Sequence, residues 1–251
     1  MSGNVFKGLG YLSEGFSLIS QPGLRLFVVI PLVLNVFLFF AFSALMASFF
    51  SDLLAWVMSG LPEWLAFIEW LLWAVYGLVI ILLFAYGFVA LANFVGAPFY
   101  GYLSELTQKK LTGKPVEVEG GWIAFLKSIP RSLLREVHKI LYYLPRAILL
   151  LILGFVPVIN LLAALLWLLF SGWMMAVQYV DYPSDNNAET FAQMKQKLAR
   201  KRLTALGFGL PVFFAAMVPV LNLIVVPAAV CGATAYWVRE EQELTAQAQS
   251  L

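Results

Sequence analysis

Charged residues are scarce in this chain, and their scarcity excludes most classes of soluble protein. Of 251 residues, 12% are charged and 62% are hydrophobic, and the mean hydropathy is +0.86. Soluble globular proteins carry about 25% charged and about 45–50% apolar residues. The net charge of +2 provides no basic field for nucleic acid. We therefore expect an integral membrane protein and exclude a soluble enzyme and a nucleic-acid-binding protein.

Cysteine and histidine are almost absent. Cys231 is the only cysteine and His138 the only histidine, so the chain has the residues for neither an intramolecular disulfide nor a Cys/His zinc site. The sequence also lacks a P-loop, a Gly-x-Ser-x-Gly motif and a His-Glu-x-x-His motif. These absences predict that the protein is not an enzyme and that it uses no metal and no cofactor.

The hydrophobic residues are concentrated in four long uncharged runs. The runs contain 26, 35, 34 and 36 residues and occupy positions 26–51, 70–104, 147–180 and 203–238. A helix that spans a bilayer needs about 20 residues, so the first run fits one span. The other three are too long for one simple span and shorter than the ~40 residues that two full spans and a turn need.

Basic residues gather in two segments, which predicts the orientation. Residues 105–146 contain eight Lys or Arg and residues 181–202 contain five, whereas the loop 51–69 contains three acidic residues and no basic one. Because basic loops stay in the cytoplasm, we expect both basic segments inside and the acidic loop outside. The run between the two basic segments must then leave the membrane on the side where it enters.

A short repeat predicts how the last two runs turn. Residues 155–161 (FVPVINL) and 217–223 (MVPVLNL) are identical at five of seven positions. Proline interrupts a helix, and Pro-x-x-Asn supplies turn chemistry. We interpret each repeat as the turn of a helical hairpin that enters the bilayer part-way, with a kinked single span as the alternative. Paired broken helices also point to the binding regions of transporters.

The N-terminal region predicts an amphipathic helix at the membrane interface. Hydrophobic residues recur at helical spacing, at Val5, Leu9, Leu12, Phe16 and Ile19. Polar residues fall elsewhere on the helical wheel, which is typical of a helix that lies along the bilayer surface.

Together these patterns predict one all-α membrane domain with two long transmembrane helices and two re-entrant hairpins. The expected parts are an interfacial helix at 1–24, membrane-spanning helices at 26–50 and 70–104, a hydrophilic basic segment at 105–146, and hairpins at 147–180 and 203–238. Within the basic segment, Ser128 and Pro130 predict a helix start.

Four cations of the basic segment recur every four residues, at Lys127, Arg131, Arg135 and Lys139. On a helix this spacing places them on one face, where Glu136 can partner Lys139. Such a face either contacts solvent and lipid headgroups or lines the path of a substrate.

Residues 20–25 (SQPGLR) combine features of an anion site. Ser20 can cap a helix whose first turn contains Pro22, and Gly23 permits close approach to the backbone. The N–H groups of a helix N-terminus favour an anion, and the guanidinium of Arg25 matches oxyanions. The alternative is an ordinary helix cap followed by an arginine that reaches the bilayer edge.

Several motifs, taken in order, resemble the bacterial CysZ family of sulfate transporters. They are residues 20–25 with 31–35 (PLVLN), 97–101 (APFYG), 130–131 with 135–136, 143–147 (YLPRA), 181–186 (DYPSDN), 219–223 (PVLNL) and 229–234 (AVCGAT). The resemblance implies sulfate uptake across the bacterial inner membrane for cysteine synthesis. It also implies an all-helical homo-oligomer with two long membrane helices and two pairs of half-penetrating helices.

The resemblance further implies a sulfate site at Gly23, Leu24 and Arg25, built from backbone N–H groups and arginine. The family has a second arginine where this chain has Leu26. Removal of one guanidinium predicts a weaker site, or one completed by another cation such as Arg131 or Arg135.

Three functions remain open at this point. The leading hypothesis is a channel-like sulfate permease whose path includes Glu105, Arg131, Arg135 and Glu136, with membrane lipids and further copies of the chain as partners. A proton-coupled symporter is the second, although no acidic residue lies inside the uncharged runs. The third is a non-conducting membrane scaffold that binds a partner.

Overall fold

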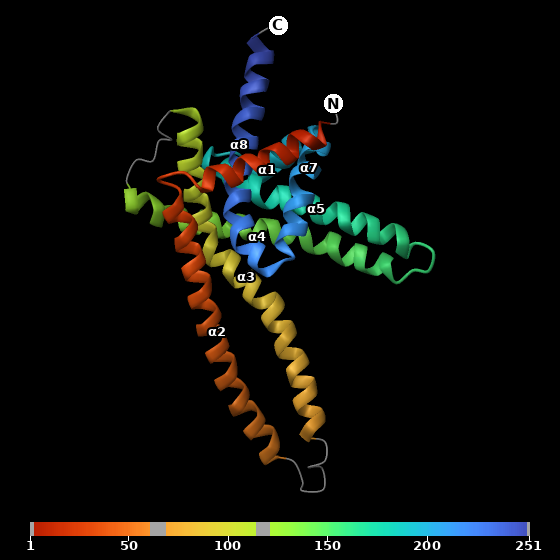
Figure 1. Cartoon of the computed structure of the whole chain (residues 1–251). Helices are drawn as coiled ribbons and strands as arrows, with labels where there is room; N and C mark the ends of the chain where they lie inside the picture. Colours follow the sequence, from red (N-terminus) through yellow and green to blue (C-terminus); the bar gives the residue numbers. More distant parts are fainter. Residues whose placement is uncertain (1–2, 61–68, 114–120, 250–251) are drawn as a thin grey trace. The chain divides into compact units, whose positions relative to one another are not determined.

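Every element in the described part of the chain is a helix (Figure 1). The computed structural model describes residues 3–60, 69–113 and 121–249. Glu63 of the acidic loop and Lys114 of the basic segment therefore lie outside the described residues. The helices are α1 (Val5–Ile19), α2 (Arg25–Ser59), α3 (Glu69–Thr112), α4 (Gly121–Gly154), α5 (Asn160–Asn186), α6 (Phe191–Arg200), α7 (Arg202–Ala216) and α8 (Pro219–Gln249). The prediction of an all-α fold is confirmed.

The chain divides into two compact units. One unit comprises Met1–Val29 with Ala97–Leu251, and the other comprises Ile30–Gly96. The second unit consists of the larger part of α2 and the first part of α3. Within it, the ring of Phe50 contacts the ring of Trp73 edge-on, with centroids 4.7 Å apart, so the two helices of this unit contact each other through aromatic side chains.

Three helical segments of the described residues are long and apolar enough to cross a membrane. They are Val36–Val57, Ile129–Gly154 and Asn160–Asn186. The first overlaps the run 26–51, for which one span is predicted, and extends past it to Val57. The other two are the arms of a single helical pair, which differs from the expected scheme of two long spans and short hairpin arms. The difference arises because α4 begins in the hydrophilic segment, at Gly121, and gives its arm 34 residues.

Both repeats lie where a helix ends and another begins. The turn between α4 and α5 contains Pro157, and α8 begins at Pro219, with two residues between it and the end of α7. Figure 1 shows α4 and α5 side by side, joined by this turn. Phe155 and Val158 in the turn are 81% and 92% exposed. An exposed apolar tip of this kind suits an apolar environment. The helix breaks at both repeats are observed, while the re-entrant hairpin arrangement stays a prediction.

The predicted helix start at Ser128 and Pro130 is wrong. Helix α4 begins at Gly121 and continues through Pro130 and Pro145. Proline removes one ladder hydrogen bond and kinks a helix, and the freed carbonyl groups can be satisfied by neighbouring groups in a membrane protein. Pro130 therefore does not have to lie in the first turn of the helix.

Helix α1 uses two faces, where the sequence predicts one apolar face. Val5, Leu9 and Phe16 are exposed, as a helix at a membrane interface requires, but Leu12 is buried in the core. The face that packs on α7 and α8 has Tyr11 and Leu18 at its centre, together with two glycines. The helix is thus confirmed, while its apolar residues are divided between the core and the exposed side.

Glycines allow α1 to approach α7 and α8 closely. A Cβ atom at Gly8 would lie 2.2 Å from the carbonyl oxygen of Thr204, and one at Gly15 would lie 2.1 Å from that of Ala228. Gly207 of α7 also permits this close approach, because a Cβ there would lie 2.1 Å from the carbonyl oxygen of Val5. Small residues at such crossings are typical of helix packing in membranes.

This packing predicts opposite effects for two substitutions in α1. Gly15→Ala forces the helices apart and should lower the free energy of unfolding by about 1–3 kcal/mol. Gly10→Ala is the matched control, since a Cβ there meets no atom within 4 Å, and it should raise stability by about 0.4–1 kcal/mol. Thermal unfolding of the detergent-solubilised protein, followed by tryptophan fluorescence, measures both; equal effects would contradict this account of the crossing.

Candidate functional site

The predicted anion motif forms a tight turn between α1 and α2. Ser20 is the C-cap of α1, the N–H of Gln21 donates to the carbonyl of Leu18 (3.0 Å), and the N–H of Leu24 donates to the carbonyl of Gln21 (3.2 Å). Gly23 has a φ angle of +91°, which side chains disfavour. The sequence SQPGLR therefore folds as a turn whose shape depends on glycine.

The three residues predicted to bind sulfate, Gly23, Leu24 and Arg25, differ in burial and in hydrogen bonding. The Leu24 side chain is buried in the core and anchors the turn, and its N–H is already used in the turn hydrogen bond. Gly23 is exposed, and a Cβ placed on it would meet no atom within 4 Å. The first N–H groups of α2, which begins at Arg25, have no acceptor within the helix. Space and free donors are thus available at Gly23 and the start of α2.

Lys110 is a second cation at this turn, and sequence reasoning did not identify it. Its Nζ atom lies 3.3 Å from the carbonyl oxygen of Pro22, while the Nε atom of Arg25 donates to the carbonyl of Ser20 at 2.6 Å. Among the described residues, no carboxylate lies within ion-pair distance of either cation. Two exposed cations without a counter-charge beside open backbone donors form a surface on which an oxyanion can bind.

The predicted cation face of α4 belongs to a buried ionic network with α5. Arg135 lies 3.2 Å from both Asp181 and Asp185, and Lys139 lies 2.6 Å from Glu136 and 3.5 Å from Asp181. Arg131 completes the network through Asp185 at 3.1 Å. Three cations therefore face three carboxylates, and the network is electrically balanced. The side chain of Lys127 lies outside the described residues.

Uncharged polar groups extend the network. Tyr182 donates its hydroxyl to Glu136 (3.4 Å) and receives a hydrogen bond from the amide of Gln178 (3.2 Å). The ammonium of Lys139 lies 4.7 Å from the ring centroid of Tyr182. Arg135 Nε and Asp181 Oδ1 are buried and, within the described structure, have ion-pair contacts but no aligned hydrogen bond. Each atom has a different ion-pair partner at 3.2 Å, Asp185 for Arg135 Nε and Arg135 Nη2 for Asp181 Oδ1, and each retains capacity for an aligned hydrogen bond.

Asp181 and Asp185 belong to this network, although neither is among the predicted site residues. Their spacing of four residues on α5 matches the spacing of Arg131 and Arg135 on α4. Two helices that pack antiparallel can align two such pairs. This complementary spacing is the sequence signal that identifies the network.

Glu105 lies apart from the network. It is in α3, just beyond the predicted span of residues 70–104, and the charge that acts on it is Lys109. Burial raises the pKa of Glu105 to about 7, and Lys109 opposes that rise. The structure therefore brings Arg131, Arg135 and Glu136 together and leaves Glu105 as a separate half-buried acid that titrates near neutrality.

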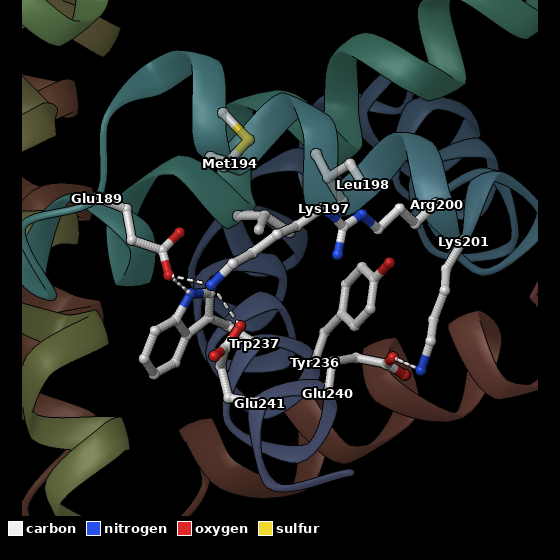
Figure 2. Close-up of a pocket in the computed structure, with 11 residues that line it drawn as sticks. Glu189, Met194, Lys197, Leu198, Arg200, Lys201, Tyr236, Trp237, Glu240 and Glu241 are labelled. Carbon is white, nitrogen blue, oxygen red and sulfur yellow. Dashed lines mark hydrogen bonds and ion pairs between the residues drawn. The ribbon is translucent and has the colours of Figure 1, made fainter. Parts of the chain in front are cut away.

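A second ionic cluster joins α6 to α8 around a small cavity of about 60 Å³ (Figure 2). Lys197 lies 2.5 Å from both Glu189 and Glu241, and the indole N–H of Trp237 donates to Glu189 at 3.2 Å. Lys201 pairs with Glu240 in the same cluster. Because these lysines are already paired with carboxylates, the cavity offers little positive potential to an anion.

No metal site is formed by the described residues, in which no three His, Cys, Asp or Glu side chains gather as ligands. Cys231 is buried, and its thiol contacts the hydroxyl of Thr107 at 3.3 Å. Its environment is that of a small core residue.

The buried network predicts a strong effect of one carboxylate on stability. Asp181→Asn leaves Arg135 and Lys139 without a shared counter-charge and should cost about 3–5 kcal/mol. Arg131→Gln is the control, because this side chain is 53% exposed and its ion pair should contribute about 0–1 kcal/mol. Thermal unfolding in detergent compares the variants, and equal losses would show that burial does not govern the network.

Comparison with known proteins places the chain in a family. The family model for the sulfate transporter CysZ and etoposide-induced protein 2.4 matches residues 11–227. A sulfate transporter CysZ of Pseudomonas aeruginosa is 44% identical over 239 residues, which cover 95% of this chain and 97% of the relative. The protein of that name from Pectobacterium atrosepticum is 43% identical over 241 residues, with 96% of this chain and 87% of the relative covered. The chain therefore belongs to the family of the sulfate transporter CysZ and etoposide-induced protein 2.4.

Proposed function

We propose that this protein is a channel-like sulfate permease of the bacterial inner membrane that supplies sulfate for cysteine synthesis. Its relatives in Pseudomonas and Pectobacterium carry the name sulfate transporter. The observation that carries the proposal is the convergence of Arg25 and Lys110 on the turn at Gly23, without a carboxylate partner in the described structure. This turn is the capture site for the anion.

The capture site suits an ion that must be bound and released. Sulfate is a strongly hydrated dianion, so its water must be replaced by N–H donors and cations, but weakly enough for the ion to leave. Arg25 and Lys110 are both exposed, and solvent screens their attraction for the anion. Lys110 also supplies the cation that is missing at Leu26, the position of the second arginine in the family.

The balanced network of α4 and α5 is the proposed polar path. Arg135 Nε and Asp181 Oδ1 retain hydrogen-bonding capacity in a buried setting, which favours a transient polar occupant. Asp181, Asp185 and Glu136 offset the cations, so that an oxyanion passing Arg131 or Arg135 would not be trapped. In this proposal the hairpins enter the bilayer part-way, α1 lies at the interface, and several copies of the chain assemble around the path.

The capture site predicts how three substitutions change sulfate binding. Arg25→Gln and Lys110→Gln should each weaken sulfate binding about 3–10-fold, because each removes one partly solvated charge contact. Leu26→Arg should strengthen it by a similar factor by restoring the family's second guanidinium. Isothermal titration calorimetry of the purified protein with sulfate measures these changes.

Lys109→Gln is the matched control for this experiment. Lys109 is the exposed neighbour of Lys110 on α3, and its loss changes the net charge by the same amount. Unchanged affinity in Lys110→Gln, or an equal loss in Lys109→Gln, would remove Lys110 from the capture site.

Proton-coupled symport is the second candidate, and Glu105 is the observation that favours it. A carboxyl with a pKa of about 7 changes its charge near neutral pH, as a proton-coupling group must. Glu105 lies at the end of an uncharged run, where a proton could reach it from the aqueous side.

Glu105 also makes stability depend on pH, with a defined sign. Its pKa is raised from 4.5 to about 7, so the folded state holds the proton more tightly, and stability falls as pH rises from about 4.5 to about 7. Glu105→Gln should remove this loss and raise the melting temperature at pH 8 by ~2 °C, after allowance for partial exposure. At pH 4 the variant and the unchanged protein should melt together.

Sulfate flux in the same variant distinguishes channel from symporter. For a channel, Glu105→Gln proteoliposomes should conduct sulfate with and without a pH gradient. Loss of gradient-driven flux in Glu105→Gln, with passive flux retained, would favour the symporter.

A further inference from the structure

A wide groove runs between the α4–α5 hairpin and the helices α6 and α7. Its volume is about 720 Å³, and it is separate from the capture turn, the buried network and the cavity of Figure 2. Its lining divides into two chemical parts, a group of cations and an apolar wall.

Three cations lie at the groove: Arg146 of α4, Lys195 of α6 and Arg202 of α7. The guanidinium of Arg146 lies 3.8 Å from the ring centroid of Tyr142, and the ammonium of Lys195 lies 4.4 Å from the same centroid. Within the described ranges, no carboxylate lies within ion-pair distance of any of the three. This separates the groove from the two ionic networks, in which every lysine and arginine named above has a carboxylate partner.

The proximity of these cations has an electrostatic cost. Burial lowers the pKa of Lys195, and the nearby charge of Arg146 lowers it further. An anion in the groove would offset this repulsion, so binding of a negative ligand would stabilise the three cations.

The apolar wall extends from the cations along the hairpin. It is formed by side chains of α4 and α5, namely Leu149, Leu150, Leu166, Leu169 and Phe170. Leu149 is 56% exposed and Leu166 39% exposed, so the wall lacks a covering element in the described structure. A small inorganic anion would contact the cations and leave this wall bare.

We propose that the groove binds an anionic phospholipid, with its phosphate at Arg146, Lys195 and Arg202 and an acyl chain along the wall of the hairpin. Basic pockets between membrane helices on the cytoplasmic side favour acidic headgroups. Both basic segments of the chain are predicted on that side, and Arg146 directly precedes the uncharged run 147–180, so in this proposal the three cations lie near the lipid headgroups. The position of Tyr142 beneath two cations adds an aromatic group suited to the interface.

Native mass spectrometry tests the lipid preference directly. The detergent-purified protein is mixed with equal amounts of phosphatidylglycerol and phosphatidylcholine that carry identical acyl chains. We expect one phosphatidylglycerol per chain to be retained about tenfold better than phosphatidylcholine. The double variant Arg146→Gln/Lys195→Gln should lose this preference, and equal retention of both lipids by the unchanged protein would overturn the proposal.

The control variant removes the same charge elsewhere. Lys109→Gln/Arg200→Gln changes an exposed residue of α3 and one that lines the cavity of Figure 2. It should keep the preference for phosphatidylglycerol. An equal loss in the control would show a general charge effect and would contradict a specific groove.

A second measurement locates the acyl chain and identifies the source of the anion. Trp173 lines the groove, so phosphatidylglycerol with brominated acyl chains should quench its fluorescence, and Trp173→Phe should remove that component of the quenching. Quenching unaffected by Trp173→Phe would place the lipid elsewhere. Displacement of the lipid by an equal concentration of inorganic phosphate would indicate a free-anion site and overturn the lipid assignment.

Discussion

The larger unit depends on charge pairing between α4 and α5. Arg135 and Lys139 are buried, and each reaches Asp181. A buried charge without a partner is far costlier than a pair, so this contact sets how the two helices align and where the apolar hairpin begins. It also neutralises the cation row that the sequence suggests as a substrate path.

The cations outside the two ionic networks are therefore the better candidates for ligand binding. In the described structure, two cation groups lie without carboxylates: Arg25 with Lys110, and the groove residues Arg146, Lys195 and Arg202. The first lies beside open backbone at Gly23 and suits a small hydrated oxyanion. The second lies beside an apolar wall and suits an anion attached to a hydrocarbon chain. The paired cations hold helices together along the proposed polar path, while these two groups are the proposed binding sites.

Local sequence patterns predicted the features that depend on neighbouring residues. The helix breaks at Pro157 and Pro219 followed from Pro-x-x-Asn. The predicted helix start at Ser20 and Pro22 is wrong, because Ser20 ends α1 and α2 begins only at Arg25. Contacts between segments distant in the sequence could not be predicted from local patterns. Lys110 comes to the turn from α3, 88 residues further along the chain than Pro22, and the inner face of α1 depends on glycines whose partner backbones are on α7 and α8. Hydrophobic periodicity contains no signal for such close crossings, since glycine contributes no apolar side chain.

Passive sulfate flux by the protein alone tests the central claim most directly. The purified chain is reconstituted into liposomes with labelled sulfate outside, equal pH on both sides and no other protein. The account predicts sulfate entry down its concentration gradient, at a rate that increases with the amount of protein. Absence of entry above that of protein-free liposomes, with protein shown to be folded by its thermal unfolding transition, would contradict a permease and favour a non-conducting membrane protein.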